Sequence, residues 1–465
     1  MEFKELLVLC GLAFAGATFA DSDFDIPEFE DSKTTLQENV QRLVSQQPAG
    51  VVVEKELPPE QNMDEPENQP ENQPLDESSL NFAPIEEKST TEESVSSTPQ
   101  GLVSMNIPDS LNRPIRVALF MGVKNLFLVE NGDTTQLSAD GFKSFTPKKI
   151  EGAKGKCIVI AETRWQLKNS CYPGSATITA KNGKLDVVNT VEVEEYLRGV
   201  VPYEMGKLDQ QRFEALKAQA VAARTYAYKH FNSRGDAGFD VYADTRDQVY
   251  KGLASATPLT DEAVKQTAGV VMTYNHKFIT AYYHSTCGGQ TETMATWQKP
   301  DLPYLKSVSD KAEKGGNWCN ESSYTKWERK FTDKEINTLF RQNASEAKVK
   351  IKDFNKVLKI EILNKLSSGR VLTMRVTTNK GSFDIWADKT RWLFKKNGSI
   401  LPSSFFSITH KEGLWIVEGK GFGHGVGMCQ MGVRGMAAAG KNYGEILGHY
   451  YQGITFEKYQ KAGQK

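Results

Sequence analysis

The sequence has little of several features that define whole classes of protein. Its 465 residues contain six cysteines, and 39% of the chain is hydrophobic. The apolar run at residues 6–20 is too short to cross a bilayer comfortably as a helix. Six cysteines are also too few to build a small disulfide-rich scaffold. These shortages exclude a protein with many membrane spans and a scaffold held together mainly by disulfides.

A net charge is lacking too, but the balance hides two oppositely charged parts. The chain has 57 basic and 58 acidic residues, which gives a formal charge of −1. Residues 21–100 hold 20 acidic and 4 basic residues, whereas residues 101–465 hold 36 acidic and 52 basic residues. An acidic tail is therefore attached to a basic body, which is long enough for one large domain or two ordinary ones.

The N-terminus has the pattern of a cleaved secretory signal. The apolar run at residues 6–20 ends with Thr18 and Ala20, small residues at the positions that a signal peptidase reads. An abrupt acidic stretch begins at Asp21, which disfavours the alternative of a buried N-terminal helix. We expect residues 1–20 to be a signal peptide and the protein to be secreted, periplasmic or otherwise in the cell envelope.

Export would place the cysteines in an environment where disulfides can form, so their pairing has to be considered. Without Cys10 the mature chain has an odd number of cysteines, which leaves at least one free or bound to a metal. The spacing alone does not prove a pairing. We expect two disulfides, Cys157–Cys171 and Cys287–Cys319, with Cys429 as the odd residue.

Composition also divides the chain. Residues 21–105 are rich in Glu, Asp, Gln, Asn, Ser and Pro, so they cannot bury enough apolar area to fold, and we predict a disordered acidic linker. Residues 106–190 contain short alternating runs such as IRVALFMG and KLDVVNTVEV, which predict a β-rich module. Residues 191–460 alternate between strand-like and helix-like pieces, and we treat them as one mixed α/β domain. The predicted fold class is α+β.

Two helices are predicted within this last domain. Over residues 209–231, Phe213, Leu216 and Ala220 recur at spacings of three and four, which gives one buried stripe on a long Ala-rich helix. A second helix is predicted at residues 442–450, at the end of the domain.

Glu204 is the first candidate for chemistry. It follows an apolar run and precedes the Ala-rich helix, so we place it at a strand-to-helix junction. Partial burial beside Val201, Tyr203 and Met205 would raise its pKa, which suits a general acid. The structural alternative is a glutamate at a helix start that is satisfied by backbone amides.

Two basic residues on the Ala-rich helix form a second candidate. Lys217 and Arg224 are seven residues apart and therefore lie on one face of the helix, where they could hold an anion in a cleft. Solvated surface charge is the competing interpretation.

The segment AYYHSTCGGQTE offers a third. His284 and Cys287 have the spacing of metal ligands, and Cys319 could add a third ligand. We favour instead a Cys287–Cys319 disulfide, with His284 hydrogen-bonded in a cleft wall. Downstream, Tyr304 and Lys306 would lie on the same side of an extended segment.

The last candidate is the glycine block at residues 419–432, GKGFGHGVGMCQMG. Its glycines indicate tight backbone turns and close ligand approach, but the pattern matches no dinucleotide or phosphate-loop fingerprint. His424 and Cys429 allow a cysteine-nucleophile interpretation, for which no fixed third partner is evident.

Taken together, these blocks resemble the sporulation stage II protein D/amidase-enhancer (SpoIID/LytB) family over residues 185–457. The motifs occur in the family's order: VNTVEVEEYLRGVVPYEM, EALKAQAVAARTYA, DTRDQVYKG, AYYHSTCGGQTE, PYLKSV and GKGFGHGVGMCQMG. This chain departs from the family pattern at Cys429, where Ser is common, and at Met431, where an aromatic residue is usual.

The resemblance implies action on bacterial cell-wall glycan. Catalytic members are lytic transglycosylases, which cut the MurNAc–GlcNAc linkage of peptide-stripped strands and leave a 1,6-anhydro sugar. One carboxyl can serve as acid and then as base there, because the 6-hydroxyl of the sugar is the nucleophile, whereas an ordinary glycosidase needs two carboxyls. We therefore predict Glu204 as the catalytic residue and seven substrate-binding residues: Lys217, Arg224, His284, Tyr304, Lys306, His424 and Gln430.

The resemblance also sets the partners and the alternatives. We expect peptidoglycan glycan strands as the partner, no nucleic acid, no integral membrane domain and no cofactor. Zinc stays open, because some members bind it through a histidine and two cysteines. The main alternative is a non-catalytic wall-binding protein that recruits or stimulates an amidase. A cysteine hydrolase and a different carbohydrate-binding role are the lesser alternatives.

Overall fold

A computed structural model describes residues 102–130, 133–139, 148–152, 157–350 and 353–460. The predicted signal peptide and nearly all of the predicted acidic linker lie outside these residues. Helices and strands both build the described part, which confirms the predicted α+β class. Within the same residues, no helix is long and apolar enough to cross a membrane.

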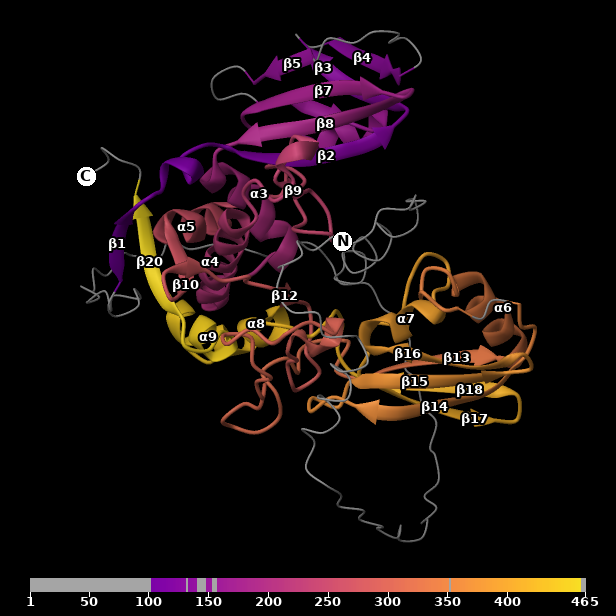
Figure 1. The fold of residues 1–465 in the computed structure, drawn as a ribbon. Coiled ribbons are helices and arrows are strands. Elements are labelled where there is room, and N and C mark those ends of the chain that lie inside the picture. Colours follow the sequence, from indigo (N-terminus) through magenta and orange to yellow (C-terminus); the bar gives the residue numbers. More distant parts are fainter. Residues whose placement is uncertain (1–101, 131–132, 140–147, 153–156, 351–352, 461–465) are drawn as a thin grey trace, which may run out of the picture.

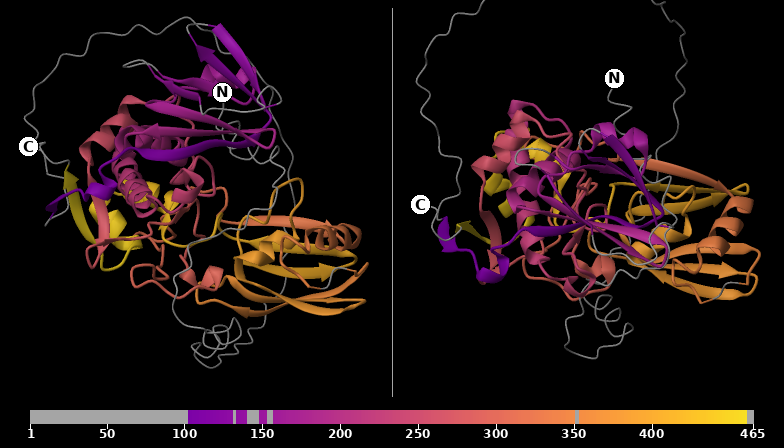
Figure 2. Two further views of the ribbon diagram at one scale, coloured as in Figure 1. Left: turned by 45° about the horizontal axis from the view of Figure 1, so that its top comes forward. Right: turned by 90° about the horizontal axis from the view of Figure 1, so that it is seen from above.

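The molecule has three parts (Figure 1). A β-rich module, formed mainly by residues 115–191, lies at one end, and a helical centre built around α4 lies beneath it. A second β domain, drawn in orange, lies to the other side of the centre. In both further views (Figure 2), the helical centre lies beside both β parts.

The β-rich module contains two sheets. One has the strand order β5-β7-β8-β2-β9 and the other has the order β4-β3-β6. In β8 every second side chain is buried, as the alternation in KLDVVNTV predicts, so one face of the strand packs into the core. The elements are β2 (Ile115–Val123), β3 (Asn125–Glu130), β4 (Asp133–Ser138), β5 (Lys148–Glu151), β6 (Val159–Ala161), η3 (Arg164–Asn169), β7 (Ser175–Lys181), β8 (Lys184–Val191) and β9 (Val241–Tyr242).

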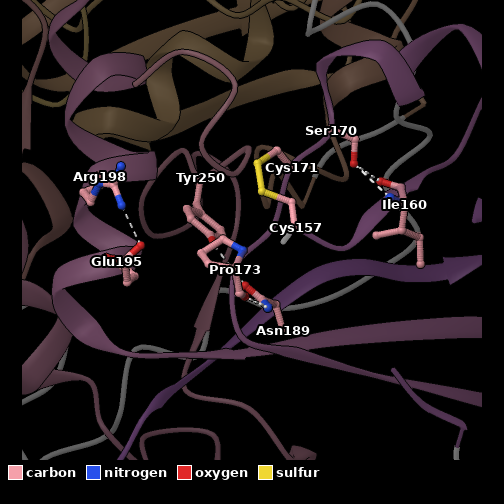
Figure 3. The surroundings of a disulfide bond; sticks show 9 residues. All are labelled: Cys157, Ile160, Ser170, Cys171, Pro173, Asn189, Glu195, Arg198 and Tyr250. Carbon is pink, nitrogen blue, oxygen red and sulfur yellow. Dashed lines mark hydrogen bonds and ion pairs between the residues drawn. A yellow bond between two sulfur atoms is a disulfide. The ribbon is translucent and has the colours of Figure 1, made fainter. Parts of the chain in front are cut away.

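A disulfide joins Cys157 to Cys171, which confirms that expected pair (Figure 3). The carbonyl of Cys171 accepts a hydrogen bond from Leu253 at 2.7 Å, so this edge of the module is attached to the loop that follows β9. Tyr250 in the same loop donates its hydroxyl to Asn189 of β8 at 3.0 Å. The module therefore fixes the loop over residues 243–253.

Helix α4 (Phe213–Lys229) runs through the centre with all of its residues from Ala215 to Tyr228 buried. The prediction for residues 209–231 is confirmed, apart from a short η4 (Gln210–Arg212) at its start. Small alanines let neighbouring elements pack close on every side. Those neighbours are α3 (Val193–Met205), α5 (Pro258–Gln266), β10 (Val270–Tyr274), β11 (Lys277–Phe278), α8 (Gln430–Ala438) and α9 (Tyr443–Tyr450).

The predicted strand-to-helix junction at Glu204 is wrong. Glu204 lies in the last turn of α3, a helix that ends at Gly206, where the backbone takes a φ of 67°. Val193, Leu197 and Val200 recur at helical spacing and are buried, but the adjacent valines resemble a strand. Short apolar runs allow either interpretation, and packing against α4 decides for the helix.

The predicted linker extends too far at its C-terminal end. Residues that it includes form β1 (Val103–Asn106), which pairs in parallel with β20 (Thr455–Gln460). These two strands continue into β10 and β11 as one four-stranded sheet. The structure thus joins the two ends of its described chain in one sheet beside α4.

A second β domain with its own hydrophobic core lies within residues 191–460, which the sequence analysis treats as one domain. It contains two three-stranded sheets, β13-β18-β17 and β14-β15-β16, covered by α6 and α7. The elements are β13 (Trp327–Thr332), α6 (Asp333–Asn343), β14 (Val357–Lys365), β15 (Val371–Thr378), β16 (Gly381–Trp386), η7 (Ala387–Lys389), α7 (Thr390–Leu393), β17 (Phe406–Lys411) and β18 (Leu414–Gly419).

The turn between β14 and β15 attaches this domain to the centre. Arg370 is fully buried, and its guanidinium donates to the carbonyls of Cys287 at 2.7 Å and Gln290 at 2.8 Å. Ser368 in the same turn donates its hydroxyl to the carboxylate of Glu292. The second domain therefore braces the AYYHSTCGGQTE segment directly.

Asp240 connects the module to the end of α4. Its carboxylate pairs with Arg113 at 2.8 Å and Arg116 at 2.9 Å, and accepts the N–H of Asn232 at 2.8 Å. Burial alone would raise the pKa of Asp240, but the hydrogen bonds from the two arginines hold that pKa well below its usual value. β9 begins at the residue after Asp240. Asp240 therefore also fixes the start of the segment that continues through β9 towards Glu204.

We expect Asp240→Ala to lower the free energy of unfolding by about 2–3 kcal/mol in urea denaturation at pH 7. This loss of stability is smaller than the usual cost of breaking a fully buried ion pair, because the side chains of Arg113 and Arg116 are 31% and 28% exposed. The exposed Asp236→Ala in the same loop is the control and should change little. The folded pKa is lowered, so the difference should persist above about pH 4 and shrink as the pH falls below it. Equal losses in both variants would contradict this account.

Candidate active site

Glu204 is held by groups from three different segments. The N–H of Val249 donates to Oε1 at 2.8 Å, and the amide of Gln430 donates to Oε2 at 3.1 Å. The side chain is half-buried, between solvent and the core. These contacts fix both oxygens, so the carboxyl group has a defined orientation.

Burial raises the pKa of Glu204 above its usual range. The N–H of Val249, the amide of Gln430 and the hydroxyl of Tyr283 each lower it again, because they donate to the charged form. The net direction is upward. Glu204 therefore holds a proton more firmly than an exposed glutamate does, which is a property that suits a general acid.

A chain of polar groups supports Tyr283 from behind. Tyr196 of α3 donates to Oε1 of Gln248 at 3.1 Å, and Nε2 of Gln248 donates to the Tyr283 hydroxyl at 3.2 Å. The amide of Gln248 also reaches the carbonyl of Ala223 in α4 at 3.3 Å. Burial raises the pKa of Tyr283 well above its ordinary value, so its hydroxyl stays protonated and can donate.

The glycine block brings Gln430 to this place. It runs beside the AYYHST segment, where β12 (Tyr283–His284) pairs in parallel with β19 (Met428–Cys429). Gly427 has a φ of 71°, and a Cβ there would overlap the carbonyl of Tyr282, so only glycine permits this approach. Gln430 then starts α8, and its amide lies 3.4 Å from Oε1 of the fully buried Gln219 in α4.

The two predicted histidines lie together. The rings of His284 and His424 are 5.5 Å apart, and that of His424 lies 4.9 Å from Trp297 and 6.1 Å from Tyr282. Burial lowers the pKa of His424 to about 4 and that of His284 well below its usual value. Both imidazoles are therefore neutral at pH 7. Tyr282, Trp297 and His424 are half-buried, and we call these three residues the aromatic patch.

Lys217 and Arg224 have structural partners. Arg224 is fully buried, and its guanidinium pairs with Glu194 of α3 at 2.7 Å and donates to the carbonyl of Val270 at 3.1 Å. Lys217 is buried and pairs with Glu214 at 2.8 Å. The predicted anion binding stays untested, but these ion pairs favour a role in packing α4 against its neighbours.

Tyr304 and Lys306 do not share one environment. Tyr304 is buried, and its hydroxyl accepts the N–H of Thr280 at 3.1 Å, whereas Lys306 is exposed. The predicted extended segment turns at Tyr304, so strand alternation does not apply there. A role for Lys306 in holding substrate stays a prediction, and Tyr304 is placed to support the segment instead.

The expected Cys287–Cys319 disulfide is not formed, and Cys287, Cys319 and Cys429 are all free and buried. Together with Asp310, these three residues place their ligand atoms within 4.8 Å of one another. We call these four residues the cysteine cluster. His284 is not among them, because its Nδ1 bonds the carbonyl of Val426 at 3.1 Å, so the histidine-containing ligand set does not assemble. The buried Cys429 also offers no exposed nucleophile.

The profile of a family described as stage II sporulation protein matches residues 181–274, which include Glu204 and α4. Stage II sporulation protein D of Bacillus subtilis is 32% identical over 291 residues, 58% of this chain and 76% of that protein. An uncharacterised protein of Brachyspira hyodysenteriae is also 32% identical, over 66% of this chain and 78% of its own length. The chain belongs to the SpoIID family.

Two further similarities concern parts of the chain. The amidase enhancer of Bacillus subtilis is 29% identical over 57% of this chain, which spans 40% of that longer protein. A domain of unknown function matches residues 314–427, which contain the second β domain. The SpoIID profile therefore covers α3 and α4, and the second domain has its own separate match.

Several residues of the site were not predicted. Gln248 and Val249 lie in the block DTRDQVYKG, and Tyr283 lies in AYYHST, but their residue types and spacing predict no role for them. The sequence held one signal of a polar network at this place. Gln219 is a glutamine within an Ala-rich helix, and a buried glutamine needs a polar partner. Trp297 had no signal beyond its residue type.

We expect the pKa of Glu204 to rise further in Gln430→Leu, because the variant removes a donor to the charged form and adds no charge. Carboxyl-carbon NMR titration of glutamate-labelled protein measures this, with Glu204→Gln used for assignment. Gln452→Leu is the matched control, because that amide bonds only main-chain carbonyls on α9. An unchanged or lower pKa in Gln430→Leu would show that this hydrogen bond does not stabilise the carboxylate.

Proposed function

We propose that the protein is a lytic transglycosylase that cleaves the MurNAc–GlcNAc linkage of peptide-stripped peptidoglycan and forms a 1,6-anhydro product. The supporting observation is the carboxyl of Glu204, which fixed donors orient and whose pKa is raised by burial. In the described part of the chain, the groups bonded to Glu204 are a main-chain N–H, an amide and a phenol. One carboxyl suffices for this reaction, because the 6-hydroxyl of the sugar is the nucleophile.

The raised pKa of Glu204 fits the first step of this reaction. Glu204 protonates the glycosidic oxygen as the bond to the anomeric carbon breaks. The resulting carboxylate then takes the proton of the sugar's 6-hydroxyl as that oxygen closes on the same carbon. The donors at Val249 and Gln430 stabilise the carboxylate between the two steps, so one residue serves both.

The aromatic patch is the surface that we assign to a sugar ring. Aromatic faces offer large apolar contact to the C–H groups of a sugar at small entropic cost. The Nδ1 of His424 accepts the N–H of Val426 at 3.0 Å, and the ring also bonds the backbone of Tyr283. This places the patch next to the residue that contacts Glu204. Because His424 is neutral, the patch carries no charge at pH 7.

The second candidate is stimulation of an amidase without catalysis, which the similarity to the amidase enhancer favours. A binder of this kind needs the surface that contacts glycan or amidase, but it does not need a proton on Glu204. A substitution of Glu204 therefore distinguishes the two functions.

We expect Glu204→Gln to lower the rate of anhydro product formation by about 10²–10⁴-fold, the usual contribution of a general acid. Glycan strands stripped of stem peptides are incubated with the protein, and mass spectrometry detects products lighter by one water than hydrolysis products. Glu195→Gln is the matched control on the same helix, because Glu195 pairs with Arg198 near the surface. Hydrated products would indicate a hydrolase. Glycan binding without products in either protein would favour the amidase partner.

A further inference from the structure

Among the described residues, the cysteine cluster is a concentration of metal-ligating atoms that lies outside the contacts of Glu204. All four of its side chains are buried, and they come from three stretches of the chain. Cys287 follows β12, Asp310 and Cys319 lie in the long loop before β13, and Cys429 is the N-cap of α8. Burying three thiols and a carboxylate together needs a compensating interaction.

We propose that the cysteine cluster binds one structural Zn²⁺ ion. Zinc prefers four ligands in a tetrahedron, with thiolates and carboxylates among its usual donors. At a Zn–S distance of about 2.3 Å, two sulfurs of a tetrahedral site lie about 3.8 Å apart. The sulfurs of Cys287 and Cys319 are 3.7 Å apart, whereas a disulfide would require about 2.05 Å. The widest pair, at 4.8 Å, must close by about 1 Å around the ion.

The sulfurs already have the outer hydrogen bonds that metal-bound thiolates use. The N–H of Gly289 points to the sulfur of Cys287 at 3.3 Å. The sulfur of Cys429 accepts the N–H of Cys287 at 3.2 Å and that of Gly432 at 3.3 Å. Backbone donors of this kind orient the ligands and offset part of their negative charge.

The carboxylate is oriented in the same way. Asp310 accepts the N–H of Cys319 at 3.0 Å on one oxygen and the hydroxyl of Tyr450 at 2.6 Å on the other. A Cβ at Gly432 would overlap that hydroxyl and lie 2.5 Å from the Asp310 carboxylate. The backbone of α8 thus approaches this group as closely as glycine allows.

A disulfide explains fewer of these observations. Bonding Cys287 to Cys319 would leave Cys429 as a buried thiol beside the carboxylate of Asp310. Zinc uses all four groups, and the three thiols release their protons to solvent as the ion binds. The ion would also fix Cys429, whose neighbour Gln430 holds Glu204, so it stabilises one wall of the candidate active site without touching substrate.

The test begins with the full-length protein, produced in zinc-supplemented medium and dialysed against metal-free buffer. Elemental analysis should give one zinc per chain. Cys429→Ala should lose that zinc, whereas the control, in which Cys157 and Cys171 are both replaced by alanine, should keep it. Stoichiometric iron, or no metal, in the wild-type protein would overturn the assignment, and this measurement does not depend on any variant folding.

Two further measurements separate zinc from a disulfide and from a merely structural tyrosine. Alkylation of the denatured, unreduced and demetallated chain should label Cys287, Cys319 and Cys429. A Cys287–Cys319 disulfide in the metal-free protein as isolated would contradict the proposal. Tyr450→Phe should weaken zinc affinity by about 10–100-fold while keeping one site at saturating zinc, the usual effect of losing an outer hydrogen bond. An unchanged zinc affinity would count against Asp310 as a ligand.

Discussion

The burial of α4 on every side is the constraint on which the rest of the structure depends. Its alanines let α3, α5, α8 and β10 approach closely, and its few polar side chains must then find partners inside the protein. Gln219 faces Gln430, Arg224 pairs with Glu194, and the carbonyl of Ala223 receives Gln248. The candidate site is thus assembled from groups that α4 holds at fixed distances.

Two opposing effects set the pKa of Glu204, and burial outweighs the hydrogen bonds. Burial favours the protonated form, and three donors favour the carboxylate. A general acid works best with a pKa near the working pH, and burial moves the pKa of Glu204 in that direction. The raised pKa follows from burial at the end of α3, and the hydrogen bonds from Val249, Gln430 and Tyr283 offset part of the effect.

Hydrophobic periodicity predicted the elements whose structure depends on the local sequence. The alternation in β8 and the helical stripe of α4 were readable because their periods persist over many residues. Glu204 was identified by its motif, but its helix was mistaken for a strand because two adjacent valines fit both. Val249 and Gln248 could not be found, because their roles arise from contacts with residues at least 25 positions away in sequence. Tyr304 was misjudged because a turn replaced the expected extended segment.

The glycine block shows why the placement of Gln430 depends on more than one core. On one side its backbone packs against Tyr282, and on another Gly425 leaves the space that the guanidinium of Arg370 fills. Arg370 belongs to the second β domain. This domain therefore packs against the glycine block, which carries His424 and Gln430. The cysteine cluster holds the far end of the same block at Cys429. A side chain larger than hydrogen at Gly425 or Gly427 would separate these parts, and the donor that orients Glu204 would move with them.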